Sequence, residues 1–193
     1  MSTLPTFSSL YHLDLTNNEI HELTSFSGFE ALQNLYLGNN LIDDISHIAE
    51  LVQLRKLRLG GNKISDLSAL TDFENLRELN LSSNLIEDIS PISNNIYLSA
   101  LYVSNNDISD LSAISNLSRL RSLWAMENRI VDISALTNLK SIEILMLTDN
   151  QITDLTMLPE NSNTYAISLA HNQNYRSFSA GKVPIPYLVK FGR

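Results

Sequence analysis

Residues 54–62 read Leu54-Arg55-Lys56-Leu57-Arg58-Leu59-Gly60-Gly61-Asn62, and this stretch decides the fold. Apolar and polar side chains alternate along its first six residues, which predicts a β-strand with one buried face and one face in water. The same nine-residue pattern recurs along the chain. It ends in an asparagine each time, at Asn18, Asn40, Asn62, Asn84, Asn106, Asn128, Asn150 and Asn172. Because the step is 22 residues each time, the chain is an array of internal repeats.

Each pair of successive strands is separated by a segment too long for a hairpin. The strands are therefore expected to run parallel, joined by right-handed crossovers. The predicted fold class is α/β: a right-handed horseshoe solenoid with a parallel sheet on its concave face and short helical or 3-10 turns on its convex face. Residues 10–172 hold eight repeats, residues 1–9 form a half-repeat or thin cap, and residues 173–193 form a C-terminal cap segment.

The asparagine after each strand is expected to be a buried turn residue. Its amide can bond loop backbone groups that no sheet satisfies. One such bond contributes roughly 1 kcal/mol, and leaving its buried partners unpaired costs about 1–3 kcal/mol. Ligand contact is the alternative role, but the same residue recurs whatever its neighbours are, which favours the structural one.

An acid–apolar–hydroxyl triplet follows in each repeat, as in Asp66-Leu67-Ser68. The hydroxyl stands where a helix N-cap belongs, so a short helical turn should begin there and bury Leu70 and Phe73. The column of acids could hold a metal or could cap backbone groups at a solvated edge. Carboxylates about 4.8 Å apart in a single row lack the dense cluster that calcium requires, which favours capping.

Composition excludes several classes of function. The net charge is -8 with a pI of about 4.9, and this balance is the opposite of the basic one typical of a nucleic-acid binder, so nucleic acid is disfavoured as a partner. There is no cysteine, which excludes disulfide-stapled caps and thiolate zinc sites. No apolar run approaches the ~20 residues of a membrane helix, and the first residues lack the pattern of a signal peptide. We therefore expect a cytoplasmic protein, although an exported chain without its signal stays open.

The two ends differ from the middle. Leu4 and Phe7 stand 22 residues before Phe26 and Phe29, so residues 1–9 resemble half of one more repeat. Three interpretations stay open: a thin cap, a natural chain that begins earlier, or a partner that covers this end of the core. Residues 161–193 hold four basic and no acidic residues, whereas residues 1–160 hold nine basic and 21 acidic ones. This asymmetry can mark an interaction tail, but a mixed cap over the last repeat is the favoured interpretation.

No catalytic constellation is visible. The four histidines are His12, His21, His47 and His171, and they fall at opposite ends of the array or on its loops. Gly60-Gly61 is a lone pair and not a phosphate-binding loop. We therefore predict no enzyme, no cofactor, no metal and no small-molecule substrate.

The variable side chains lie on the wet face of the strands. The middle exposed position of each strand is occupied by Asp14, Tyr36, Arg58, Asn80, Tyr102, Trp124, Met146 and Ser168, and the next one mostly by small residues apart from Met126. Eight strands at about 4.8 Å span roughly 34 Å, wide enough for a folded protein. Aromatic residues, Arg and Met are enriched at interfaces. We predict a protein-binding concave face formed by Tyr36, Arg58, Asn80, Tyr102, Trp124, Met126 and Met146.

The 22-residue unit resembles two groups of leucine-rich-repeat proteins. Repeats such as residues 62–70, and the Ser90-Pro91 pair, are similar to those of the bacterial internalins. The Trp124 strand, Asn94-Asn95 and the C-terminal Tyr175-Arg176 resemble the leucine-rich regulatory subunit of protein phosphatase 1. The second resemblance implies an intracellular scaffold or regulatory subunit that grips a phosphatase catalytic subunit, the first a secreted or surface adhesion module. A purely structural array is the third possibility.

Overall fold

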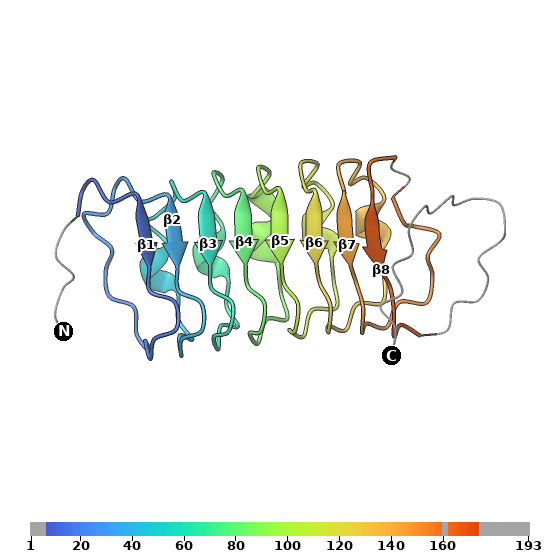
Figure 1. Ribbon diagram of the computed structural model, residues 1–193, viewed down its shortest axis with the longest axis horizontal. Coiled ribbons are helices and arrows are strands. Elements are labelled where there is room, and N and C mark those ends of the chain that lie inside the picture. The colour runs from blue at the N-terminus through green and yellow to red at the C-terminus, as the bar shows by residue number, and fades with distance from the viewer. Residues whose placement is uncertain (1–6, 160–161, 174–193) are drawn as a thin grey trace.

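Every repeat contributes one short strand to a single sheet in the computed structural model, which describes residues 7–159 and 162–173 (Figure 1). The eight strands pair in chain order and all run parallel, as predicted. Their bounds are β1 His12–Asp14, β2 Asn34–Tyr36, β3 Lys56–Arg58, β4 Glu78–Asn80, β5 Ala100–Tyr102, β6 Ser122–Trp124, β7 Ile144–Met146 and β8 Ala166–Ser168.

The strands are shorter than the alternating pattern suggests, but the backbone ladder continues past their ends. The Leu37 N–H donates to the Arg58 carbonyl at 2.7 Å, and the Asn39 N–H donates to the Gly60 carbonyl at 2.8 Å. Each residue is paired with the residue 22 positions further on, so equivalent side chains of all repeats form columns across the sheet. Residues 22 positions apart in the sequence are therefore neighbours in the structure.

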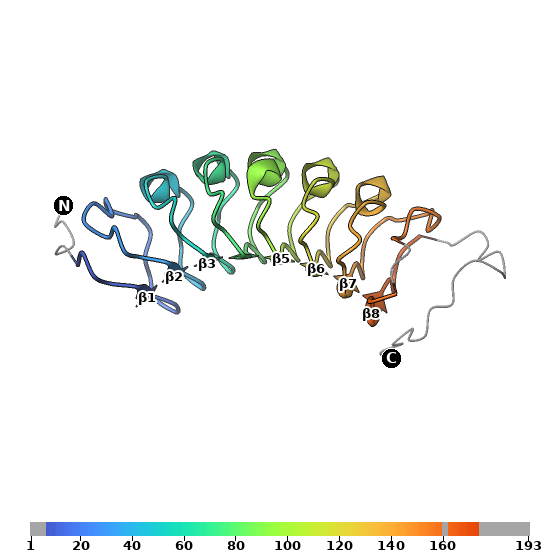
Figure 2. The same ribbon diagram turned by 90° about the horizontal axis from the view of Figure 1, so that it is seen from above.

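Short 3-10 turns cover the side of the array opposite the sheet, on the outside of a gentle arch (Figure 2). Their bounds are η1 Ser46–Ile48, η2 Ser68–Leu70, η3 Ser90–Asn94, η4 Ser112–Ile114 and η5 Ser134–Leu136. Each begins at the hydroxyl residue of the triplet, as predicted, and Pro91 sits in the first turn of η3. Among the described residues, the first and seventh repeats have no such turn.

The capping role predicted for these hydroxyls is wrong. None of the five turns has a side-chain cap from its serine. The preceding acid is the acceptor instead: Asp66 Oδ1 accepts the Ser68 N–H at 2.8 Å, and the Ser68 hydroxyl donates to Asp66 Oδ2 at 3.1 Å. The carboxylate reaches the backbone first because it stands two residues upstream, the geometry of an Asx turn.

The core lies between the sheet and the turns. Leu57, Leu70 and Phe73 are completely buried, as are their equivalents in the neighbouring repeats. Each repeat contacts mainly the repeats before and after it, so the buried columns form one continuous apolar core along the array.

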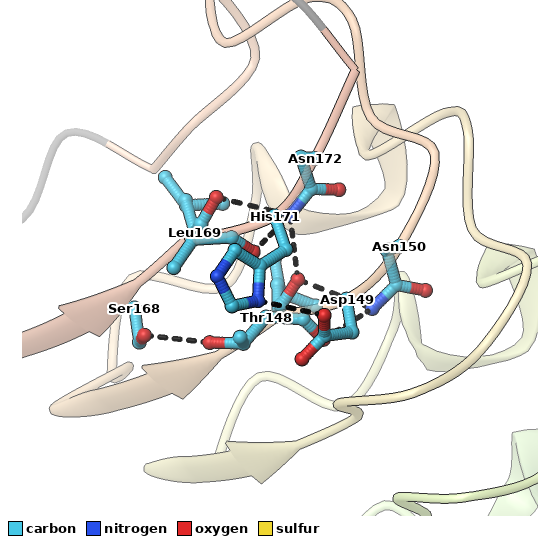
Figure 3. A network of polar contacts seen from close by, with 9 residues as sticks. Thr148, Asp149, Asn150, Ser168, Leu169, His171 and Asn172 are labelled. Carbon is cyan, nitrogen blue, oxygen red and sulfur yellow. Dashed lines mark hydrogen bonds and ion pairs between the residues drawn. The ribbon is translucent and has the colours of Figure 1, made fainter. Parts of the chain in front are cut away.

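A ladder of asparagines closes the strand ends. Asn40 Oδ1 accepts the Ile20 N–H at 3.0 Å, and its amide donates to the Leu15 and Leu37 carbonyls at 3.0 Å each. The pattern repeats down to Asn172, which donates to the Leu169 carbonyl at 3.1 Å (Figure 3). Asn40, Asn84, Asn106, Asn128 and Asn150 are buried, whereas Asn62 and Asn172 are half-buried and Asn18 is exposed. The shared hydrogen bonds confirm the predicted structural role.

The residue before each ladder asparagine has a left-handed backbone, as in Asn39 (φ 53°) and Asp149 (φ 56°). Gly61 (φ 73°) is the one glycine in this column. A Cβ there would collide with the side chain of Asn39 in the neighbouring repeat, so a larger residue at this position requires Asn39 to move.

The predicted caps fall mostly outside the described residues. Leu4 and nearly all of the 173–193 segment belong to the part of the chain that is not described. Phe7 is described, and its ring meets that of Phe29 edge-on with centroids 5.9 Å apart, the in-phase packing expected of a preceding half-repeat. None of the helical turns in residues 7–159 and 162–173 is long and apolar enough to cross a membrane.

Candidate functional site

The inner face of the sheet carries three columns of side chains. Two are those predicted, the column that contains Tyr102 and Trp124 and the column that contains Met126. The third comprises the first residue of each strand, which the predicted binding face did not include: His12, Asn34, Lys56, Glu78, Ala100, Ser122, Ile144 and Ala166. Its alternation with the buried leucines could have revealed it. The concave face is therefore wider than predicted, and its two halves differ in chemistry.

The C-terminal half carries an apolar patch, defined here as Tyr102, Trp124, Met126, Ile144 and Met146. Register places Tyr102 beside Trp124 and Trp124 beside Met146. The rings of Tyr102 and Trp124 lie at an interplanar angle of 33° with centroids 6.1 Å apart. All five side chains are half-buried, so they still present an apolar surface to solvent.

The indole of Trp124 is held in place. Its Nε1–H donates to the Ser122 hydroxyl at 2.9 Å, two residues earlier on the same strand. Ala100 and Ser122 flank the aromatic pair, so no charge touches it from the adjacent column. A fixed aromatic surface without charges loses little entropy and little solvation when another surface covers it.

The N-terminal half carries a charged cluster, defined here as Tyr36, Lys56, Arg58 and Glu78. Arg58 Nη2 lies 2.6 Å from Glu78 Oε1, and Lys56 Nζ lies 3.3 Å from Glu78 Oε2. The Arg58 guanidinium also stacks on the Tyr36 ring at 4.5 Å. Burial acts to raise the pKa of Glu78, but hydrogen bonds and charges from Arg58 and Lys56 outweigh it, so the pKa lies below its ordinary value.

Tyr36 and Arg58 therefore belong to this cluster, and one strand, β4, lies between Arg58 and Tyr102 of the apolar patch. Asn80 stands between the two halves, and its Oδ1 accepts the Ser82 N–H at 3.0 Å. The structure brings four of the seven predicted residues together: Tyr102, Trp124, Met126 and Met146.

An open hollow of about 790 Å³ lies over the N-terminal half, beside the charged cluster. Gly38 and Gly60 form part of its floor, with Asp14 and Asn80 among its walls. A Cβ at position 60 would lie 2.9 Å from Asn80 Oδ1 and 3.2 Å from the Ser82 carbonyl, so a larger residue there would crowd the floor of the hollow. The hollow is polar and wide open, unlike the enclosed, mainly apolar pockets that hold small molecules.

The described residues contain no group of three or more His, Asp or Glu side chains placed to hold a metal ion. The acids of the predicted column are occupied with backbone groups, which lowers the pKa of Asp44 and Asp154 through the N–H of Ser46 and Thr156. His171 Nδ1 lies 2.8 Å from Asp149 Oδ1 at the edge of the array (Figure 3). This contact links two neighbouring repeats.

Two family models match the chain. One, described as two copies of the leucine-rich repeat, matches residues 52–94 and 118–160, and another, described as a leucine-rich repeat, matches residues 8–64. Together they cover more than half of the 193 residues. No curated protein matches the chain at a significant level.

Solved structures of bacterial proteins are similar to the chain. An internalin of Listeria monocytogenes has a TM-score of 0.79 at 29% identity, covering 86% of this chain and 56% of that one. Internalin C2 of the same organism has a TM-score of 0.68 at 30% identity, covering 82% and 80%. A leucine-rich-repeat protein of Leptospira interrogans has a TM-score of 0.79 at 28% identity, covering 86% and 44%. The chain thus spans about half the length of the first and third structures.

Proposed function

This chain is a member of the leucine-rich-repeat family, and on that premise we propose that it is a non-enzymatic module that binds a partner protein on its concave face. Solenoids of this kind commonly serve as interaction modules because their curvature creates an extended binding surface. The proposal adds that the apolar patch is the part of this surface that contributes most to affinity.

The observation that carries the proposal is the alignment of Tyr102, Trp124 and Met146 on three adjacent strands. Folding alone does not require large apolar side chains there, because the equivalent positions in other repeats are polar, as at Asp14 and Asn80. Trp and Tyr dominate the energetics of protein interfaces, where truncation of one such residue typically costs about 2 kcal/mol or more. A contiguous half-exposed cluster of them favours a binding role.

The location of the protein and the class of its partner are part of the proposal. The lack of cysteine and the Trp124 strand favour an intracellular scaffold or regulatory subunit, for which a phosphatase catalytic subunit is the partner implied by resemblance. The second candidate is an internalin-like adhesion module, favoured by 30% identity to internalin C2 over 80% of its length. Direct titration with purified phosphatase 1 catalytic subunit separates them, since only the first predicts tight binding.

The concave-face proposal is tested by affinity capture with three forms of the chain. The native form is compared with the double variant Tyr102→Ala, Trp124→Ala. The matched control is Leu85→Ala, Val131→Ala, which removes two exposed apolar side chains from loops beyond the sheet. We expect the native and control forms to retain the same partner and the double variant to lose it. Equal retention by all three forms would show that the patch is not the binding surface.

A further inference from the structure

The basic and acidic residues of the chain lie in different regions. Residues 53–58, 75–80, 97–102 and 119–124 comprise strands β3 to β6 and the three residues before each of them, and they hold six basic residues and one acidic one. Everywhere else in residues 1–160 there are three basic and 20 acidic residues. A protein with a net charge of -8 therefore carries one concentrated basic strip beside its concave face.

Part of this strip is neutralised within the chain. Glu78 pairs with Lys56 and Arg58. Arg121 lies 3.3 Å from Glu143. Arg119 stacks on the exposed ring of Tyr97 at 4.5 Å.

Two arginines of the strip have side chains without a partner in the described part of the chain. Arg55 and Arg77 are both exposed, and no hydrogen bond or ion pair of either guanidinium is found within residues 7–159 and 162–173. They occupy equivalent positions in neighbouring repeats, since the Arg77 N–H donates to the Arg55 carbonyl at 2.8 Å. Like charges on neighbouring strands disfavour folding, so the fold gives no reason for this pair.

We propose that Arg55, Arg77 and Arg121, named here the arginine rim, bind a short acidic peptide segment of the partner protein. This inference rests on the proposed function and assigns chemistry to one edge of the same interface. The guanidinium fork matches a carboxylate in a bidentate geometry. Neighbouring strands are about 4.8 Å apart, and carboxylates at alternate positions of an extended segment are about 6.6 Å apart, a difference that long arginine side chains can span.

The length of the rim separates a short acidic segment from a long polyanion. Arg55 and Arg121 are three rungs apart, or about 14 Å, which an extended segment of about five residues spans. A nucleic acid or a long sulfated polysaccharide would extend past the rim and meet the excess of acidic residues in the rest of residues 1–160. At physiological ionic strength the Debye length is about 8 Å, so a short ligand senses mainly the rim.

The arrangement also fits the apolar patch. Arg121 directly precedes strand β6, and Trp124 ends that strand. A partner whose acidic segment follows the rim would therefore bring the adjoining residues over Trp124 and Tyr102. Such charges at the edge would govern the association rate and its salt dependence, while the patch would govern the dissociation rate.

The probe is a fluorescein-labelled peptide of about twelve residues in which Glu alternates with Ser, titrated by anisotropy at about 150 mM salt. The rim variant is Arg55→Gln, Arg77→Gln. The matched control is Lys63→Gln, Lys140→Gln, which changes the net charge equally at two exposed lysines outside the strip. We expect the rim variant to bind roughly tenfold more weakly and the control to bind like the native chain, since only the rim offers paired guanidinium groups.

Three results would overturn the proposal: no binding of the peptide to the native chain, equal weakening in both variants, or binding of a heparin fragment without binding of the peptide. The variant Tyr102→Ala, Trp124→Ala should still bind the peptide normally. The two proposals can fail separately. If the native chain does not bind the peptide but Tyr102→Ala, Trp124→Ala loses the partner, the arginine-rim proposal is contradicted and the concave-face proposal stands.

Discussion

Asp132 accepts two hydrogen bonds from Ser134, one from its backbone N–H to Oδ1 and one from its hydroxyl to Oδ2, each at 2.8 Å. The same pair recurs on the convex side of the array, for example between Asp88 and Ser90. The acid therefore fixes the start of the 3-10 turn, and the hydroxyl fixes the acid.

This relationship predicts an order of effects for two substitutions. Asp132→Ala removes the acceptor of both bonds, whereas Ser134→Ala removes only the hydroxyl donor and leaves the backbone bond in place. We expect the midpoint of urea denaturation to fall more for Asp132→Ala than for Ser134→Ala. The reverse order would show that the serine, and not the aspartate, is the cap.

The same bonds predict how stability depends on pH. The Ser134 N–H, and then its hydroxyl, lower the pKa of Asp132, and equivalent donors lower those of Asp44 and Asp154 below the usual 3.8. A carboxyl whose pKa is lower in the folded state contributes stability above its unfolded pKa and loses it as the pH falls through the folded one. The denaturation midpoint should therefore decrease below about pH 4, and Asp132→Asn, Asp154→Asn should flatten that decrease. An identical pH profile in the variant would contradict the assignment.

Asn95 is predicted to be a site where stability can be gained. It is completely buried in a column that holds Leu51, Phe73 and Leu117 in other repeats, and its Oδ1 has no hydrogen-bond partner. Its amide donates to the Phe73 carbonyl at 2.6 Å, but that carbonyl also accepts the Leu76 N–H and so keeps a partner. Asn95→Leu should stabilise the chain by about 1–3 kcal/mol in urea denaturation, because an unpaired buried acceptor is removed. A destabilised variant would indicate that Oδ1 is satisfied by a buried water.

Asn106 provides the opposite case among the buried asparagines. Its Oδ1 accepts the Ile86 N–H at 3.0 Å, and its amide donates to the Leu81 and Val103 carbonyls at 3.1 Å each. Asn106→Leu leaves the Ile86 N–H without that acceptor, and the expected loss is about 1–3 kcal/mol. The exposed Asn116 serves as the control, since Asn116→Leu should change the denaturation midpoint little.

Most of the fold was predictable because one physical rule repeats every 22 residues. The strand order, the buried columns and the asparagine ladder all follow from that period. Residue types alone did not predict whether Asp66 or Ser68 caps the turn, since both side chains can accept a backbone N–H.

The candidate site was predictable in part. Alternation along the strands identified Tyr102, Trp124 and Met146, which the structure places side by side. The same reasoning grouped Arg58 with them, although its ion pair with Glu78 and its stacking on Tyr36 place it in a separate cluster. That pairing depends on side-chain direction across strands, which the repeat period does not determine.

The measurement that tests the central claim most directly is the affinity of the captured, purified partner for three forms of the chain by isothermal titration. The account predicts that the control Leu85→Ala, Val131→Ala binds like the native chain. Tyr102→Ala, Trp124→Ala should bind at least about thirtyfold more weakly, the effect of losing roughly 2 kcal/mol at an interface hot spot. Unchanged affinity in a folded double variant would contradict the claim that the partner binds through the apolar patch of the concave face.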